Sequence, residues 1–248
     1  MSGESDSQVI FVIGAGGGVG KPLCERLAKR GATVIGVGRS EDKLKSVGDH
    51  CASTLTLDAK DPDAVSEAVS AIVKEHGRID GAVNLAGSIL LKPAHSTSPD
   101  EFRETIELNL TTAFNMVRAV AQPMSKHGGG SVVLMTSAVA EHGYPAHEAI
   151  SAAKAGVIGL ARSAASTYAS KGVRFNCVAP GLTDTPMAGQ IFGSEPALKA
   201  SLAMHANGRA GQPEQVASAI DFLLQADQAH VTGQVLAVDG GLSRVHAK

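Results

Sequence analysis

The chain has 248 residues, 44% of them hydrophobic, and a formal net charge of −2 at pH 7. That length suits one α/β domain with a large core, and the scattered lysines and arginines lack the clustering that nucleic-acid binding requires. No apolar run approaches the roughly 18 residues that span a bilayer, and the polar, acidic start does not resemble a secretory signal. We therefore expect a cytoplasmic protein with a single domain over residues 1–248, residues 1–7 disordered, and neither a membrane nor a nucleic-acid partner.

Short apolar runs alternate with helix-like segments along the chain. The predicted strands cover residues 8–13, 33–37, 53–57, 79–85, 131–136, 173–179 and 234–238. The predicted helices cover residues 18–30, 62–76, 99–126 and 148–170. Strands that are apolar on both faces and separated by helices are typical of a parallel sheet that is covered on both sides. We therefore predict an α/β fold with a doubly wound (Rossmann) parallel sheet flanked by helices.

Residues 183–211 fit this alternation least well, and we expect them to form a mobile substrate lid. The middle of this segment, residues 187–208, is mostly small and apolar, which favours an uncharged or apolar small-molecule substrate.

The stretch IGAGGGVG, residues 13–20, follows the first predicted strand and opens the first predicted helix. Gly14, Gly18 and Gly20 follow the spacing G-x-x-x-G-x-G, whereas the spacing G-x-G-x-x-G fails because its last position is Val19. Glycine allows positive φ and a close approach of phosphate, and the free amides of the next helix then face that anion. We interpret the loop, Val19 included, as a dinucleotide-binding loop; the alternative is a plain tight turn.

The end of the second predicted strand bears on which dinucleotide would bind. Dinucleotide sites that select NAD usually place an acid there, but this chain has Gly38 followed by Arg39. A guanidinium pairs with a 2′-phosphate through two N–H bonds, so the sequence favours NADP(H). The alternatives are that Arg39 is a solvated surface residue and that the nearby Glu41 and Asp42 offset its charge. Asp58 is a candidate partner for the adenine amino group, or else a cap of the following helix.

In this order the segments resemble the short-chain dehydrogenase/reductase family over residues 9–242. The resemblance rests on the glycine loop, NLAG (84–87), NL (109–110), NCVAPGLTDTPM (176–187) and VTGQVLAVDGG (231–241). It implies a single domain, a seven-stranded parallel sheet, and hydride transfer between a nicotinamide and a carbonyl or alcohol. It also implies a homotetramer built on the two long helices, where Ala152, Ala153, Ala155 and Gly156 would permit close approach.

The resemblance assigns roles by position. Asn109 would hold a proton-relay water at a helix kink, Ser137 would orient the substrate carbonyl, and Lys154 would bind the nicotinamide ribose. The residues implied to line the cofactor are Asn84, Ala86, Gly87, Pro180, Gly181, Thr183 and Thr185. Other readings stay open: Asn109 could bridge neighbouring strands, Ser137 could cap a turn, and Lys154 could lie at the surface.

The chain departs from the family pattern at Ile150, where the spacing from Ser137 and Lys154 places the catalytic tyrosine. Isoleucine has no proton to give, and a positioned general acid typically contributes about 10²–10⁴-fold to the rate. His147 lies one helical turn earlier on the same face and is our candidate proton donor. The alternative is that His147 has no catalytic role, because many family members with an intact tyrosine carry a histidine at this place. Tyr144 and His142 are further candidates if their loop folds inward. Two alternatives remain: reduction of an enoyl or dienoyl thioester, which asks less of an acid here, and a protein that only binds the nucleotide.

The three cysteines, Cys24, Cys51 and Cys177, lie far apart in the sequence and cannot all pair. We expect reduced, buried thiols. No spacing of histidine and cysteine resembles a metal site, so no metal is expected.

Overall fold

The computed structural model of the chain describes residues 7–246. Its seven strands are β1 (Val9–Ile13), β2 (Thr33–Gly38), β3 (Ser53–Thr56), β4 (Gly81–Asn84), β5 (Gly130–Met135), β6 (Val173–Pro180) and β7 (Val235–Val238). They form one sheet in the order β3-β2-β1-β4-β5-β6-β7, and each neighbouring pair is parallel. The predicted seven-stranded, doubly wound α/β fold is confirmed.

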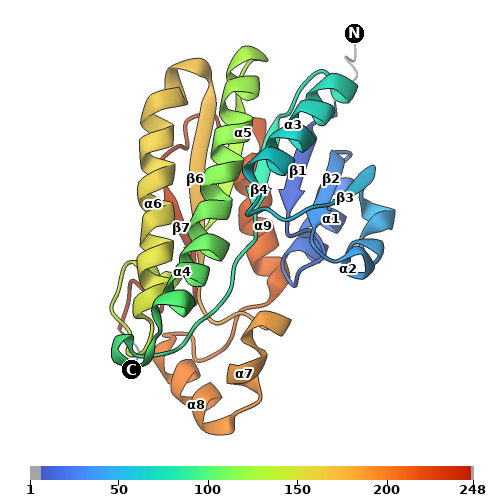
Figure 1. Cartoon of the computed structure of the whole chain (residues 1–248). Helices are drawn as coiled ribbons and strands as arrows, with labels where there is room; N and C mark the ends of the chain where they lie inside the picture. Colours follow the sequence, from blue (N-terminus) through green and yellow to red (C-terminus); the bar gives the residue numbers. More distant parts are fainter. Residues whose placement is uncertain (1–6, 247–248) are drawn as a thin grey trace.

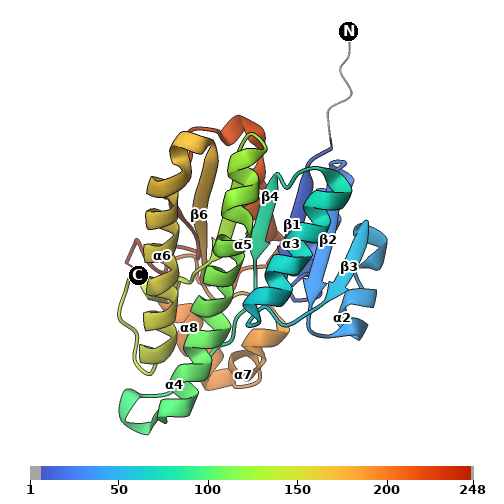
Figure 2. The same cartoon turned by 45° about the horizontal axis from the view of Figure 1, so that its top comes forward.

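Helices cover both faces of this sheet. Those in the described residues are α1 (Gly20–Lys29), α2 (Glu41–Lys45), α3 (Pro62–His76), α4 (Pro99–Ile106), α5 (Thr112–Lys126), α6 (Glu148–Tyr168), α7 (Gly189–Phe192), α8 (Glu195–Met204) and α9 (Pro213–Leu224). Figure 1 shows α3, α5 and α6 side by side over one face, and Figure 2 shows the same layer from a second direction. No helix within residues 7–246 is long and apolar enough to cross a bilayer.

Alternation along β1 divides the core into two layers. Phe11 and Ile13 pack with the helices α3, α5 and α6, whereas Ile10 and Val12 pack with α1 and α9. Successive side chains of a strand point to opposite faces, so a central strand that is apolar throughout can fill both layers. All four of these side chains are at most 2% exposed.

The predicted helix over residues 99–126 is not continuous. A π-helical turn, Glu107–Thr111, separates α4 from α5. Within it the side chain of Asn109 donates to the Thr105 carbonyl oxygen at 2.9 Å, and the Thr112 hydroxyl donates to the Leu108 carbonyl oxygen at 3.0 Å. Both bonds bring a side-chain donor to a backbone carbonyl oxygen at the widened turn. The predicted helix over residues 99–126 therefore contains an irregular turn at Asn109, where the family resemblance implied a kink.

Several helices escaped prediction, and α9 is the one that matters most for the fold. It begins with Pro213 in its first turn, and Gln212 and Gln215 bond reciprocally as a capping box. Helix α9 buries Val216, Ile220 and Leu223 against the sheet. The crossover from β6 to β7 therefore has the same form as the others, which the sequence-based assignment missed.

The segment predicted as a lid lies beyond the carboxyl ends of the strands, at the bottom of Figure 1, and contains α7 and α8. Thr183 and Gly211 form an isolated parallel bridge at its two ends. The Asp184 amide donates to the Gly211 carbonyl oxygen at 2.9 Å, and the Gly211 amide donates to the Leu182 carbonyl oxygen at 2.8 Å. The base of the segment is thus fixed to the sheet.

The N-terminal residues 1–6 lie outside the described residues, so the predicted disorder of residues 1–7 can be addressed only at Ser7. Its hydroxyl group donates to the Gly31 carbonyl oxygen, so this residue has a defined partner.

Candidate active site

The glycine loop joins β1 to α1 at the carboxyl edge of the sheet. Gly14 has φ +86°, a conformation that L side chains rarely adopt, and its amide donates to the Val37 carbonyl oxygen at 2.7 Å. A Cβ atom at Gly18 would lie 2.7 Å from a methyl carbon of Thr185, and one at Gly20 would lie 2.1 Å from the Gly14 carbonyl oxygen. All three glycines of the predicted spacing are therefore required by the backbone or by close neighbours.

The amides at the start of α1 point to an anion site. Val19 occupies the N-cap position of this ten-residue helix, and no side chain caps it. Within residues 7–246 the amides of Gly18 and Val19 donate to no protein acceptor. Unpaired amides at a helix N-terminus favour a phosphate group. The loop therefore fits the pyrophosphate of a dinucleotide.

The turn after β4 forms the second wall. The Asn84 side chain donates to the Thr112 hydroxyl at 3.2 Å and accepts the Ala86 amide at 3.0 Å, so Asn84 fixes the turn. A Cβ atom at Gly87 would lie 2.7 Å from Oδ1 of Asn109 and 3.4 Å from Nζ of Lys154. Glycine at position 87 thus lets the backbone pass directly over both polar side chains.

Asn109 is buried and fully engaged. Its Oδ1 accepts the Ser88 amide at 3.2 Å, and its Nδ2 donates to the Ser88 hydroxyl at 3.1 Å as well as to the Thr105 carbonyl oxygen. The residue therefore bridges the π-helical turn and the loop after β4, rather than two strands.

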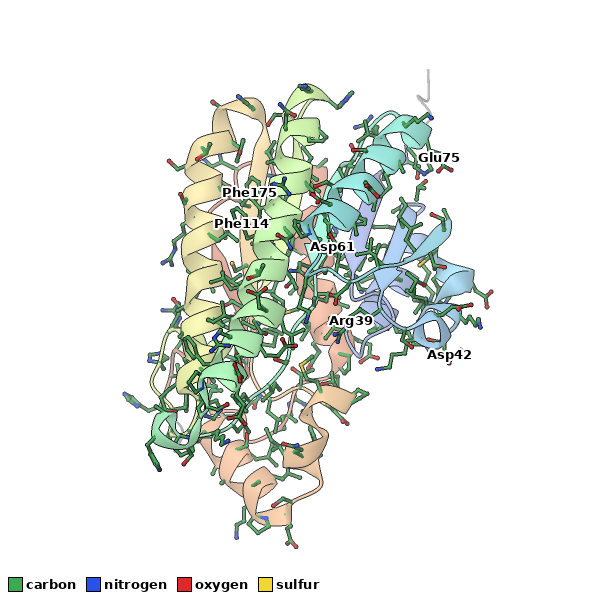
Figure 3. All side chains as sticks on the ribbon, in the orientation of Figure 1. Arg39, Asp42, Asp61, Glu75, Phe114 and Phe175 are labelled. Carbon is green, nitrogen blue, oxygen red and sulfur yellow. The ribbon has the colours of Figure 1, made fainter. Side chains whose placement is uncertain are left out.

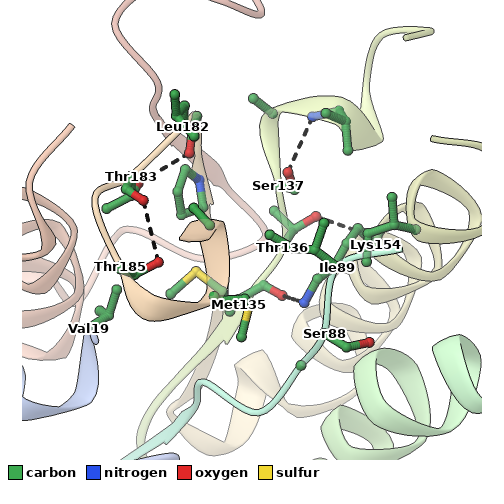
Figure 4. A pocket seen from close by; sticks show the side chains of 18 of the residues that line it. Val19, Ser88, Ile89, Met135, Thr136, Ser137, Lys154, Leu182, Thr183 and Thr185 are labelled. Carbon is green, nitrogen blue, oxygen red and sulfur yellow. Dashed lines mark hydrogen bonds between the residues drawn. The ribbon is translucent and has the colours of Figure 1, made fainter. Parts of the chain in front are cut away.

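Lys154 projects from α6 into the interior and is only 6% exposed, so the alternative of a surface lysine is wrong. Its Nζ donates to the Met135 carbonyl oxygen at 2.9 Å, and the Thr136 hydroxyl donates to the Lys154 carbonyl oxygen at 2.9 Å (Figure 4). Burial disfavours the ammonium form and lowers the pKa of Lys154 to about 8. This lysine can therefore present a cation near neutral pH and release a proton in mildly basic solution.

Ser137 follows β5 and begins a short turn of 3-10 helix over Ala138–Ala140. Its Oγ accepts the Val139 amide at 3.5 Å, the upper limit for a hydrogen bond (Figure 4). Ser137 therefore caps this turn, as the alternative held, but only through a weak hydrogen bond. The hydroxyl proton donates to no acceptor within residues 7–246, which leaves it available to a ligand.

His147 is the N-cap residue of α6, and Ile150 lies in the first turn of the same helix, 4% exposed. The His147 Nδ1 lies 2.7 Å from the Pro145 carbonyl oxygen. A carbonyl can only accept, so Nδ1 carries the proton and Nε2 is the nitrogen left to a ligand. The Tyr144 hydroxyl donates to the Leu242 carbonyl oxygen at 3.1 Å, and burial raises the pKa of this phenol.

These residues surround one cavity of about 250 Å³. Its polar lining includes Ser137, His147 and Lys154, and Ile150 lies among them. The apolar lining comes from the loop after β4, the turn after β5, the segment after β6 and the segment after β7: Ile89, Leu91, Val139, Met187, Ile191, Met204 and Leu242. A cavity of this kind suits an uncharged ligand that is oriented by a few polar groups.

Most of the predicted site residues line this cavity: Gly14, Gly18, Val19, Gly20, Ala86, Gly87, Asn109, Ser137, His147, Lys154, Pro180, Gly181, Thr183 and Thr185. Arg39, Asp58 and Asn84 do not. His142 does not line it either, and its ring bonds instead to the Ser243 carbonyl oxygen.

Asp58 does not cap the helix that follows it, as one alternative held. Its Oδ1 accepts the Lys60 amide at 3.0 Å, whereas Asp61 is the N-cap of α3 and accepts the amides of Asp63 and Ala64. The carboxylate of Asp58 therefore shapes the turn before α3.

His205 is a cavity residue that sequence reasoning missed. It ends α8 and is 3% exposed, with Nε2 accepting the Leu182 amide at 3.1 Å and Nδ1 donating to the Ser201 carbonyl oxygen at 2.8 Å. Both ring nitrogens are used, so this histidine fixes α8 to the loop after β6. A single histidine in an apolar segment gives no sequence signal for such a role.

Comparison with known proteins assigns the family. A family model described as enoyl-(acyl carrier protein) reductase matches residues 14–243. The chain belongs to the short-chain dehydrogenase/reductase family, whose members are oxidoreductases that use nicotinamide cofactors. The family resemblance seen in the sequence is thereby confirmed.

Relatives cover nearly the whole chain. It is 35% identical over 240 residues to the 3-oxoacyl-[acyl-carrier-protein] reductase FabG of Vibrio cholerae, covering 96% of this chain and 98% of that one. It is 36% identical over 246 residues to the cis-4-hydroxycyclohexanecarboxylate dehydrogenase of Sinomonas cyclohexanicum, covering 96% and 97%. Among solved structures, a short-chain type dehydrogenase/reductase from Mycobacterium ulcerans superposes with a TM-score of 0.90 at 31% identity, covering 97% and 91%. Levodione reductase superposes equally well, with a TM-score of 0.90 at 30% identity, covering 96% and 98%.

Burial of Lys154 predicts a measurable pH dependence of stability. The pKa of Lys154 is about 8 in the folded protein against an ordinary 10.5, so between these pH values the unfolded chain binds more protons. The contribution of this lysine to stability therefore rises with pH in that window. Relative to Lys154→Met, we expect the unfolding free energy of the wild type to gain about 1 kcal/mol between about pH 7 and about pH 9.

Urea unfolding of the cofactor-free proteins measures this difference. The exposed Lys126 at the end of α5 provides the control, because Lys126→Met removes a lysine without removing a buried charge. A free-energy difference, wild type minus Lys154→Met, that stays constant or falls with rising pH would contradict the assignment.

Proposed function

We propose that this protein is an NADP(H)-dependent oxidoreductase that transfers hydride to or from a small, uncharged carbonyl or alcohol. Its proton donor differs from the tyrosine expected at position 150. One observation supports this most strongly: Ser137, Lys154 and His147 line a single apolar cavity beside the glycine loop, with Ile150 among them. The site keeps the groups that would hold a cofactor and a carbonyl, and it offers a different titratable side chain.

The preference for a 2′-phosphate rests on Arg39. This residue follows β2, is exposed, and makes no hydrogen bond or ion pair within residues 7–246 (Figure 3). The two acids that could have offset its charge pair with Lys45 instead, Glu41 at 3.3 Å and Asp42 at 3.6 Å. Arg39 is therefore free to pair bidentately with a phosphate, which supports NADP(H) over NAD(H).

A bound nicotinamide would supply the hydride, while the chain's own residues bind, orient and protonate. The amides of Gly18 and Val19 would hold the pyrophosphate, and Lys154 would donate to the ribose hydroxyls. The free hydroxyl proton of Ser137 bonds to the substrate oxygen and fixes its orientation. The apolar walls exclude water, which strengthens these hydrogen bonds.

The proton comes from Nε2 of His147. Pro145 holds the proton on Nδ1, so a second proton taken up from solvent resides on Nε2 and passes to the substrate oxygen during reduction. Tyr144 is the weaker candidate because its hydroxyl already donates to the Leu242 carbonyl oxygen and its pKa is raised.

A second function is favoured by the apolar side chain at position 150 together with the description of the matched family model. In this alternative the substrate is an enoyl or dienoyl thioester. Hydride then goes to carbon, and the demand for an acid beside Ser137 is smaller.

The proposal also includes a cytoplasmic location and a homotetramer that packs through α4, α5 and α6. Large apolar side chains lie exposed on this layer, with Phe102 44% and Phe114 51% accessible; Phe114 is labelled on α5 in Figure 3. Of the small residues predicted to allow close packing, Ala152 and Ala155 are exposed on α6. Ala153 is buried, and a Cβ at Gly156 would lie 2.8 Å from Leu110 of the same chain, so those two serve the internal core instead.

The cofactor preference is directly testable. We expect NADPH to bind at least about 10-fold more tightly than NADH, the effect of one charge-assisted pair. Arg39→Ala should remove that preference by weakening NADPH alone. Titration of cofactor fluorescence measures both affinities, with Lys74→Ala as a control that removes an exposed base from the last turn of α3. Equal affinities in the wild type would refute the assignment.

Loss of the proposed donor should slow chemistry without weakening binding. We expect His147→Ala to lower kcat for ketone reduction by about 10²-fold, the low end for a lost general acid. Cofactor affinity should not change, because the residue acts in the transition state. His142→Ala is the matched control, since His142 lies in the same loop but does not line the cavity.

Ile150→Tyr separates the remaining possibilities. If the wild type reduces no substrate but this variant reduces ketones, the natural protein is a nucleotide-binding protein. If enoyl thioesters turn over and His147→Ala has little effect, the alkene alternative holds. Ketone reduction at an unchanged rate in the His147→Ala variant would defeat the histidine as donor.

The assembly is tested by sedimentation. We expect a particle of about four times the 25.3 kDa chain mass at micromolar concentration, with dihedral symmetry. Phe114→Glu should dissociate it, because the charge would be desolvated at the interface. The control is Phe222→Glu, since Phe222 is comparably exposed, at 43%, on α9 behind the sheet. A wild-type monomer would contradict the model of packing through these helices.

A further inference from the structure

Two of the three cysteines meet on the sheet face covered by α1. Cys24 lies on the buried side of α1, and Cys51 follows a short turn and immediately precedes β3. They are 27 positions apart in the sequence, yet Cys51 packs against the buried cluster that contains Cys24, and the two thiols lie close enough to shift each other's pKa. The expectation of buried thiols is wrong for Cys51, which is only half-buried, whereas Cys24 is buried as expected.

The strand beside this pair makes room for it. A Cβ atom on Gly36 of β2 would lie 2.9 Å from Sγ of Cys51 and 3.1 Å from Cβ of Ala15. A larger residue at position 36 would therefore push the sulfur away from Cys24. Glycine at this point brings the β2–β3 connection against α1 directly behind the glycine loop.

The two thiols differ in access and in acidity. Cys51 is partly accessible to solvent, and hydrogen bonds from the Cys24 thiol and the Gly36 backbone lower its pKa even though burial opposes this. Cys24 is fully buried, and its pKa is raised by the same thiol contact and by burial. A thiolate is the reactive form of cysteine, so an oxidant meets Cys51 first.

We propose that Cys24 and Cys51 form a peroxide-sensitive dithiol, in which Cys51 is oxidised first and Cys24 resolves it into an intramolecular disulfide. In the first step the Cys51 thiolate attacks a peroxide oxygen; the O–O bond breaks, hydroxide leaves, and Cys51 becomes a sulfenic acid. In the second step the Cys24 sulfur attacks the Cys51 sulfur, the S–O bond breaks, and water leaves with the thiol proton. Two electrons pass to the peroxide, and a dithiol reductant reverses the change.

The third cysteine provides an internal comparison. Cys177 is fully buried in β6, its thiol faces the Val157 carbonyl oxygen at 3.9 Å, and burial raises its pKa to about 12. It has neither access nor a neighbouring thiol. The disulfide is therefore specific to the first two cysteines.

Hydrogen peroxide treatment of the full chain, followed by intact mass measurement and thiol counting in denaturant, tests the proposal. We expect a mass loss of about 2 Da, corresponding to two hydrogens. Of the three thiols one should remain, and dithiothreitol should restore all three. Non-reducing digestion should yield a peptide that joins Cys24 to Cys51. Cys177→Ser should behave like the wild type.

Trapping of sulfenic acid with dimedone tests the order of the two steps. Cys24→Ser should accumulate the adduct on Cys51, whereas Cys51→Ser should give none on Cys24. Three free thiols after treatment, over-oxidation of Cys51 without a cross-link, or a disulfide that joins two chains would each overturn the proposal. The wild-type digestion gives this answer even if a variant fails to fold.

Discussion

The buried ammonium group of Lys154 is the interaction on which the arrangement of the site depends. A cation removed from water is costly unless its protons find acceptors, and one of them bonds to the Met135 carbonyl oxygen at the end of β5. The Thr136 hydroxyl, next along the chain, donates to the backbone carbonyl oxygen of Lys154 in α6. Strand β5 and helix α6 are thereby held in a fixed register, with Ser137 and Ile150 brought to the same cavity.

The space around that ammonium explains features that are otherwise unconnected. Gly87 must lack a side chain because Asn109 and Lys154 lie directly beneath it. Asn109 in turn holds the loop after β4 through Ser88, and it can do so because the π-helical turn aims its side chain across the sheet edge. A widened helical turn is uncommon and frequently functional. Here it lets one amide satisfy both the turn and the loop.

Sequence reasoning reached the sheet and the cofactor loop because both follow short-range rules. Apolar runs separated by helices predict parallel strands. The positions of Gly14, Gly18 and Gly20 are recognisable from spacing within one short segment. Sequence reasoning failed for features that depend on segments brought together by the fold, because such features leave no signature in residue spacing. Three examples are the widened turn at Asn109, the role of His205 and the meeting of Cys24 with Cys51. Helix α9 was missed for a different reason: it follows a segment already set aside as a lid, although Pro213 marked its start.

Ile150 changes the surroundings of the Lys154 ammonium but leaves that lysine in the cavity. The isoleucine at position 150 supplies no oxygen with which the ammonium could share a proton, so it leaves Lys154 less solvated than a polar side chain would. A pKa of about 8 still keeps most of the group charged at neutral pH. Burying a charged lysine with one carbonyl partner in the described structure costs free energy. If Lys154 served only the core, an apolar side chain at this position would remove that cost. The cost is offset when a ligand hydroxyl accepts its remaining protons, and the unpaired amides of Gly18 and Val19 require the same kind of offset from an anion. Both demands would be met by one dinucleotide lying across the carboxyl edge of the sheet, and under the proposed function only the proton donor would differ from the family pattern.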